Sequence, residues 1–343
     1  MDINITPKTN MKEKIIISHE ISKFRSLIMG LAMLSIMLFH QCFTNSFPFN
    51  LFHNFGYWGV DIFLFLSGMG LTKSLDNNSL KTFYLRRFNR IIPSCLLCGS
   101  IKYCIFLLLG SSVAILKDGL NIGIWSIMSL DLWFIPTIII LYTISPILYH
   151  LIKKKTLATT AVIILFFFIN GVFIKPKVGY DWLSTLGIIA WTIERLPVFC
   201  AGMYISIRKD WIDRKIYYSF PFLFVAVVLG ALEKTDITFR EIQAFKFFMI
   251  MIGMPAIIYI CLTILKKCSH MVIGVIDFFG LYSLELYLVH EFVFWCLKVN
   301  FNNENPFLLL LSSFMISCIT AYGCKWVLGK VNTIIKSIQT RNI

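Results

Sequence analysis

Long apolar stretches alternate with short polar ones from one end of the chain to the other. A helix needs about 20 mostly apolar residues to cross the hydrocarbon core of a bilayer, and stretches near that length recur throughout. The pattern therefore predicts an all-α, polytopic transmembrane helical bundle of about ten spans. We expect these spans at 26–44, 57–75, 91–112, 126–149, 156–174, 183–206, 216–232, 245–265, 271–296 and 306–328.

The composition agrees with a membrane protein. Of the 343 residues, 57% are hydrophobic and 15% are charged, whereas soluble domains carry about 25% charged residues. The first residues are polar and charged and do not resemble a cleaved secretory signal, so we expect the first span to be retained. We find no internal repeat of about 20–50 residues. We expect one transmembrane domain, 23–330, with cytoplasmic tails at 1–22 and 331–343.

The chain has a formal net charge of +14, which by itself would be compatible with nucleic-acid binding. The placement of the charges argues against that function. If the amino terminus faces the cytoplasm, most of the 32 Lys and Arg residues lie in cytoplasmic tails and connections, as the positive-inside rule requires. We therefore expect both termini in the cytoplasm, contact with anionic lipid headgroups, and no nucleic-acid partner.

The first span carries an imidazole, His40, near its outer end and a guanidinium, Arg25, at its start. The two residues are fifteen positions apart, about 22 Å along a helix, and lie on broadly one face of it. A titratable side chain inside a span costs free energy and is a functional candidate by default. The alternatives are an imidazole satisfied by a neighbouring helix and an arginine that extends to the headgroups.

Three arginines occur within five residues at the start of the third span, in FYLRRFNRIIP (83–93). Arg87 and Arg90 are three positions apart, so both point the same way if the helix has begun. Guanidinium groups suit phosphates, and a helix start adds backbone N–H donors. The alternative is a positive-inside anchor that binds no ligand.

Further ionisable residues lie within the expected spans; they are Asp61, Glu194, Arg195, Glu285 and His290. Such groups normally face the interior of a bundle and pair with one another. Because adjacent side chains diverge on a helix, Glu194 and Arg195 are each expected to have a separate partner. Cys95 and Cys98 form a C-x-x-C without a second pair or a nearby histidine, so we expect no metal site.

Six stretches occur in a particular order: MGLAMLSIMLFH (29–40), GVDIFLFLSGMGL (59–71), RRFNRIIP (86–93), LWFIPTIIILYTISP (132–146), RLPVFCAGMYI (195–205) and GLYSLELYLVH (280–290). Together they resemble the acyltransferase-3 family of bacterial integral-membrane O-acyltransferases. Each stretch is mostly apolar and weak evidence alone, but six in sequence are fairly specific. The resemblance spans nearly the whole chain, from about residue 20 to residue 328.

Members of that family transfer acyl groups, commonly acetyl from acetyl-CoA, to hydroxyls of cell-envelope carbohydrates. The resemblance implies acetyl-CoA or another acyl-CoA as donor, a carbohydrate or glycolipid as acceptor, and a multi-pass protein of the bacterial cytoplasmic (inner) membrane. His40 matches the family's essential histidine, and Arg87 and Arg90 match its R-x-x-R pair, which would bind the donor. The family often has a basic residue eleven positions before the histidine, where this chain has Met29; Arg25, one turn earlier, is the nearby substitute.

We expect His40 to act as the general base that deprotonates an acceptor hydroxyl, since an imidazole pKa of about 6.5 suits proton transfer near neutrality. A covalent acyl-histidine is the mechanistic alternative. A carboxylate is expected to orient the imidazole, Asp61 by preference and Glu285 next. Arg25 is expected to join the arginine pair in holding the donor's phosphates.

Two other classes of function remain open on the sequence. A transporter or flippase for a glycan or lipid-linked substrate tends to show internal repeats with charges in matching halves, and the two halves of this chain do not match convincingly. A sensor or scaffold without chemistry would leave an arginine-rich helix entry and an intramembrane histidine unexplained. The sequence therefore favours the enzyme.

Overall fold

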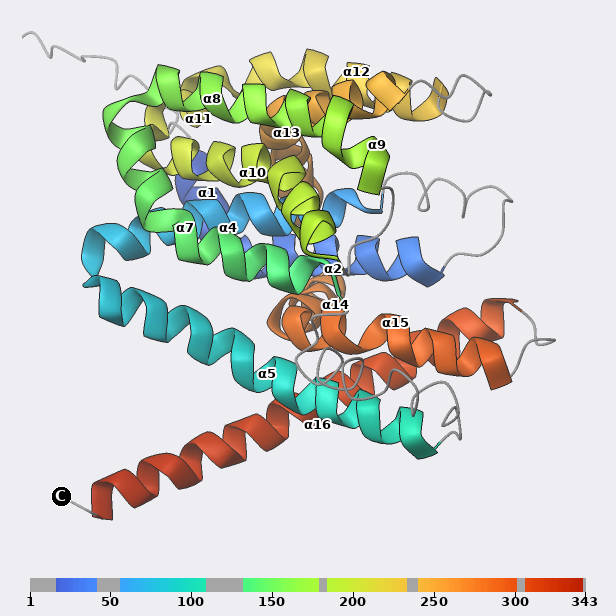
Figure 1. The fold of residues 1–343 in the computed structure, drawn as a ribbon. Coiled ribbons are helices and arrows are strands. Elements are labelled where there is room, and N and C mark those ends of the chain that lie inside the picture. Colours follow the sequence, from blue (N-terminus) through green and yellow to red (C-terminus); the bar gives the residue numbers. More distant parts are fainter. Residues whose placement is uncertain are drawn as a thin grey trace, which may run out of the picture.

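The computed structural model describes residues 17–41, 56–108, 132–178, 184–232, 240–300 and 306–341 (Figure 1). Its regular elements in these ranges are helical, as expected: α1 (Ile17–Lys23), α2 (Arg25–Gln41), α4 (Trp58–Asn77), α5 (Leu80–Leu108), α7 (Phe134–Lys154), α8 (Thr156–Ile169), the π-helical turn η1 (Asn170–Ile174), α9 (Lys175–Val178), α10 (Thr185–Ile207), α11 (Lys209–Lys215), the 3₁₀ turn η2 (Ile216–Ser219), α12 (Phe220–Leu232), α13 (Arg240–Leu265), α14 (His270–Leu281), α15 (Ser283–Asn300) and α16 (Pro306–Arg341). Most of the expected tail 1–22 lies outside the described residues, and α16 continues through most of the expected tail 331–343.

The helices include several that are able to cross a membrane. Within the described ranges, five are long and apolar enough, or up to seven if each of two sharply bent pairs counts as one span. The five lie in α7, α8 with η1, α10, α13 and α16. The protein is therefore an all-α polytopic membrane bundle, whereas the expected number of about ten spans is not confirmed.

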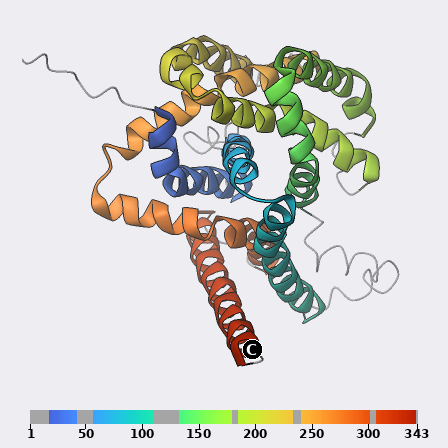
Figure 2. The ribbon, with the colours of Figure 1, turned by 90° about the vertical axis from the view of Figure 1, so that its left-hand side faces the viewer.

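One expected span, 271–296, is two helices that meet at 82°. Tyr282 separates them with φ −101° and ψ 12°, outside the α-helical region. The bend lets α14 lie across the bundle (Figure 2) while α15 runs beside α5 and α16. A similar bend of 70° separates α1 from α2. Hydropathy did not predict the break at Tyr282, because the residues on both sides of it are mostly apolar.

The centre of the bundle is α4, which packs closely against α10 through two glycines. A Cβ atom on Gly68 would overlap the backbone carbonyl of Phe199, and one on Gly202 would overlap that of Phe65. Small residues allow such backbone-to-backbone approach in membrane helices. Because α4 also packs on α2, it lies between the helix that carries His40 and the helix that carries Arg195.

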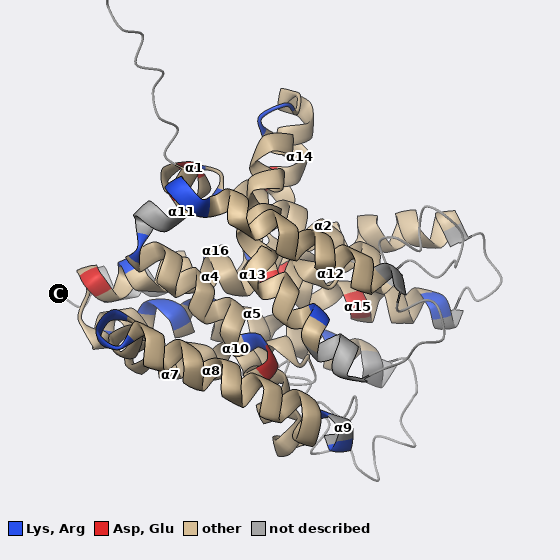
Figure 3. Cartoon of the chain, turned by 90° about the horizontal axis from the view of Figure 1, so that it is seen from above, with Lys and Arg blue, Asp and Glu red and all other residues tan. Residues whose placement is uncertain are grey.

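The basic residues are unevenly distributed along the bundle. Figure 3 shows that Lys and Arg gather mainly at the end where α11 and the C-terminus lie. This asymmetry agrees with a positive-inside arrangement. The cytoplasmic location of both termini stays a prediction.

Candidate active site

The last turn of α2 places His40 against α15. The ring of His40 lies edge-on to the ring of His290, with their centroids 5.2 Å apart. Nδ1 of His40 is 4.0 Å from Oε1 of Glu291, and the His40 side chain remains 28% exposed. His40 is thus directed at a neighbouring helix and is still accessible. The structure therefore gives it polar neighbours that lie 250 residues away in the sequence.

His290 is the main residue of this site to which sequence reasoning gave no role. Its side chain is buried, and its Nδ1 lies 3.0 Å from the carbonyl oxygens of Leu286 and Tyr287. Its Nε2 is buried and has no hydrogen-bond partner in the part of the chain that the structure describes. One signal was present in the sequence: His40 ends the first of the six stretches and His290 ends the last.

The structure pairs Asp61 with Arg195 of α10. Nη1 of Arg195 donates to both carboxylate oxygens of Asp61, at 2.8 and 3.0 Å, and both side chains are buried. The guanidinium also lies 5.5 Å from the ring centroid of Trp133 and 4.6 Å from that of Phe247. None of these contacts joins Asp61 to His40, so the geometry favours a structural ion pair over the orienting role that the sequence suggested.

The neighbour of Arg195, Glu194, has a different partner. Nζ of Lys175 donates to Oε2 of Glu194 at 2.5 Å and lies 3.0 Å from the ring centroid of Trp191. Adjacent residues on α10 thus reach separate partners, as the geometry of a helix predicts.

Glu285, the second carboxylate proposed to orient His40, lies in the first turn of α15 and faces α5. Its Oε1 accepts a hydrogen bond of 2.9 Å from the hydroxyl of Ser94, and both residues are buried. This contact ties α15 to α5. Among the described residues, the carboxylate that is brought to the His40 ring is instead Glu291.

Arg25, Arg87 and Arg90 form a cluster, although they come from two helices. The guanidinium of Arg25 lies within electrostatic range of Arg87, Arg90 and the hydroxyl of Tyr142, and it rests on Gly70, where a Cβ would overlap it. Nε of Arg87 is buried without a hydrogen-bond partner. No ion pair between described residues involves any of the three. The cluster therefore presents concentrated positive charge, which suits an anionic ligand.

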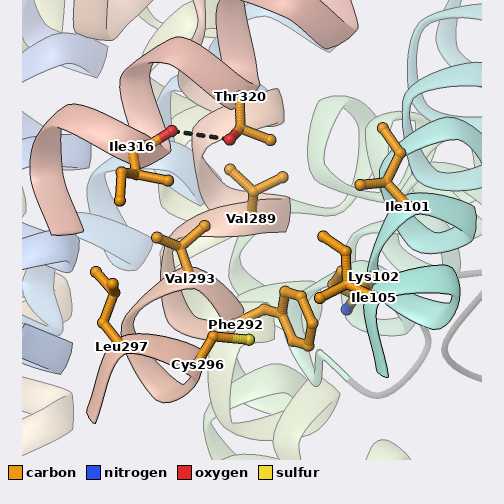
Figure 4. Close-up of a pocket in the computed structure, with 10 residues that line it drawn as sticks. All are labelled: Ile101, Lys102, Ile105, Val289, Phe292, Val293, Cys296, Leu297, Ile316 and Thr320. Atoms are coloured by element: carbon orange, nitrogen blue, oxygen red, sulfur yellow. Dashed lines mark hydrogen bonds between the residues drawn. The ribbon is translucent and has the colours of Figure 1, made fainter. Parts of the chain in front are cut away.

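A cavity of about 160 Å³ lies between α5, α15 and α16 (Figure 4). Its lining is mostly apolar; it consists of Ile101, Lys102, Ile105, Val289, Phe292, Val293, Cys296, Leu297, Ile316 and Thr320. The Thr320 hydroxyl donates to the carbonyl of Ile316, and Lys102 lies within electrostatic range of His290. This lining offers little to a carbohydrate, and it includes neither the three arginines nor His40.

The arginine cluster and the histidine pair, which consists of His40 and His290, lie at opposite ends of α2. Arg25 is the first residue of α2 and His40 is in its last turn, about 22 Å apart along a straight helix. The described residues contain no group of three or more His, Cys, Asp and Glu side chains that could hold a metal ion. The arrangement can bind an anion at one end of α2 and accept a proton at the other.

Comparison with known proteins agrees with this arrangement. The model of the acyltransferase-3 family, described as an acyltransferase domain, matches residues 27–328. No curated protein and no solved structure matches the chain significantly. Since the family match covers His40, Arg87, Arg90 and His290 and most of the sequence, the chain belongs to the acyltransferase-3 family of membrane acyltransferases.

Proposed function

We propose that the protein is an O-acyltransferase of the bacterial inner membrane that moves an acyl group, most simply acetyl, from cytoplasmic acyl-CoA to a hydroxyl of a cell-envelope carbohydrate. The observation that carries this proposal is the placement of the arginine cluster and the histidine pair at opposite ends of α2. A ligand with phosphates at one end and a reactive thioester at the other matches this arrangement.

The arginine cluster is the donor-binding end. Guanidinium groups bind phosphate oxygens through paired hydrogen bonds. Three like charges that are close together and partly buried repel one another, so a ligand with several phosphates relieves an unfavourable arrangement. Arg25 lies close to Arg87 and Arg90, and this supports its taking the place of the basic residue that the family often has at the position of Met29.

His40 is the catalytic end. One ring nitrogen removes the proton of the acceptor hydroxyl while the hydroxyl oxygen attacks the thioester carbonyl. The C–S bond then breaks, its electron pair passes to sulfur, and the resulting thiolate takes the proton from His40. Glu291 beside Nδ1 favours a proton on that nitrogen and stabilises the imidazolium. This assigns to Glu291 the orienting role that the sequence suggested for Asp61 or Glu285.

The test is acyl transfer by the purified protein in detergent. With labelled acetyl-CoA and envelope carbohydrates, we expect release of free CoA and labelling of the carbohydrate, whereas a transporter or flippase would release no CoA. Carbohydrates whose acylation differs between a deletion strain and its parent, found by mass spectrometry, supply the acceptor. His40→Ala should abolish transfer at an unchanged level of folded protein; wild-type activity in this variant would remove His40 from the mechanism.

A further inference from the structure

The protonation of the His290 ring is fixed by its surroundings. Its Nδ1 lies 3.0 Å from the backbone carbonyl oxygens of Leu286 and Tyr287. Carbonyl oxygens only accept hydrogen bonds, so Nδ1 must carry the hydrogen. In the neutral ring, which burial favours, Nε2 is therefore a hydrogen-bond acceptor with a free lone pair.

This acceptor has no donor within the described part of the chain. The His290 side chain is 1% exposed, and its Nε2 has no hydrogen-bond partner. Buried polar atoms in proteins are nearly always paired, and an exception calls for an explanation. The neighbours of the His290 ring include the polar rings of His40 and Tyr287, with centroids 5.2 and 5.8 Å away. Because the nitrogens lie on the rim of each imidazole ring, two nitrogens that face each other across the separation from His40 are within hydrogen-bond distance.

A neutral His40 has one N–H group, which is favoured on Nδ1 because that atom faces Glu291. When the other nitrogen removes the proton of the acceptor hydroxyl, the ring gains a second N–H and a positive charge. A hydrogen bond from a charged donor is roughly twice as strong as one between neutral groups. A hydrogen-bond acceptor that faces this new N–H would therefore bind the His40 ring more strongly only after proton transfer has begun. Such an interaction lowers the barrier without tightening substrate binding.

We propose that His290 is a positioning residue for His40: after His40 has taken the hydroxyl proton, Nε2 of His290 accepts a hydrogen bond from the new N–H until that proton passes to the departing thiolate. The proposal rests on the proposed function, because it concerns the same proton transfer. No covalent bond forms to His290. The hydroxyl O–H breaks, an N–H forms on His40, and the proton passes to the departing thiolate. Glu291 and His290 then stabilise the imidazolium from α15.

The experiment compares two replacements in the full-length protein. His290→Leu removes the acceptor, whereas His290→Gln keeps an oxygen acceptor near the position of Nε2. We expect the Leu variant to lower kcat about 10- to 100-fold, the effect of losing a hydrogen bond to a charged group, with both KM values changed by less than about twofold. The Gln variant should recover most of that loss. The same two replacements at His150, which is exposed on α7, are matched controls and should leave kcat unchanged.

Two results would overturn the proposal: wild-type kcat in the Leu variant, or equal losses in folded Leu and Gln variants. If the Leu variant does not accumulate in the membrane, His290→Phe replaces it, and the same comparison with Gln decides. The His40→Ala variant separates the two proposals. If it stays active, the proposed function of His40 fails; if it is inactive while the Leu variant at His290 is fully active, only the role of His290 fails.

Discussion

Removing one member of the Asp61–Arg195 ion pair is expected to destabilise the bundle strongly. Removing both members is expected to lower the free energy of unfolding by much less than the two single losses added together. Asp61→Asn would leave a guanidinium that is 4% exposed without its counter-ion. Arg195→Gln would leave a carboxylate that is 1% exposed without compensation. In the double variant, the two amides can bond to each other and neither charge is buried.

The magnitude follows from the burial and geometry of the pair. Breaking a buried, hydrogen-bonded ion pair by removing one partner costs about 3–5 kcal/mol of unfolding free energy. Arg195 also lies close to the rings of Trp133 and Phe247, and each cation–π contact is worth about 0.5–2 kcal/mol. Arg195→Gln should therefore be the more damaging single change. The double variant should be more stable than additivity predicts by about 2 kcal/mol.

The assay is reversible unfolding in mixed detergent micelles, with acetyl-CoA-dependent CoA release measured on the same samples. The exposed pair of Lys153 and Asp76, with Nζ 3.6 Å from Oδ1, provides the control: Lys153→Gln should cost less than about 1 kcal/mol. The reasoning would be refuted if Asp61→Asn and Arg195→Gln each lowered the free energy of unfolding by less than the control does. It would also be refuted if the loss in the double variant equalled the two single losses added together. A folded double variant as inactive as His40→Ala would show that the ion pair is needed for catalysis as well as for stability.

Three further predictions concern the site. Arg87→Ala and Arg90→Ala should each raise the KM for acetyl-CoA about 10-fold, because each removes a charged hydrogen bond to phosphate; initial rates at varied donor concentration test this, and an unchanged KM would assign the pair to topology alone. Gly70→Ala should raise the same KM several-fold by displacing the guanidinium packed on it, whereas Gly274→Ala, where a Cβ meets nothing within 4 Å, should have no effect. Glu291→Gln should lower kcat by about two- to fivefold, since a half-exposed pair at 4.0 Å contributes less than about 1 kcal/mol; a loss as large as that of His40→Ala would contradict this weak role.

The sequence by itself determined the features that depend on local geometry and on transfer from water. Apolar stretches near span length predicted an all-α membrane bundle, because a helix satisfies its own backbone hydrogen bonds in lipid. Helical spacing placed Arg87 and Arg90 on one side of α5 and separated the partners of Glu194 and Arg195. The six ordered stretches predicted the family without reference to any contact between helices.

Only the tertiary structure decided which side chains meet across the bundle. On the sequence, Asp61 and Glu285 were reasonable neighbours for His40, but close packing of α4 on α10 brings Asp61 to Arg195, and α5 supplies Ser94 to Glu285. The bend at Tyr282 separates α14 from α15, which carries His290 beside His40. Periodicity along one helix shows which face is buried. It does not show which residue of another helix lies opposite, because that depends on the packing of the whole bundle.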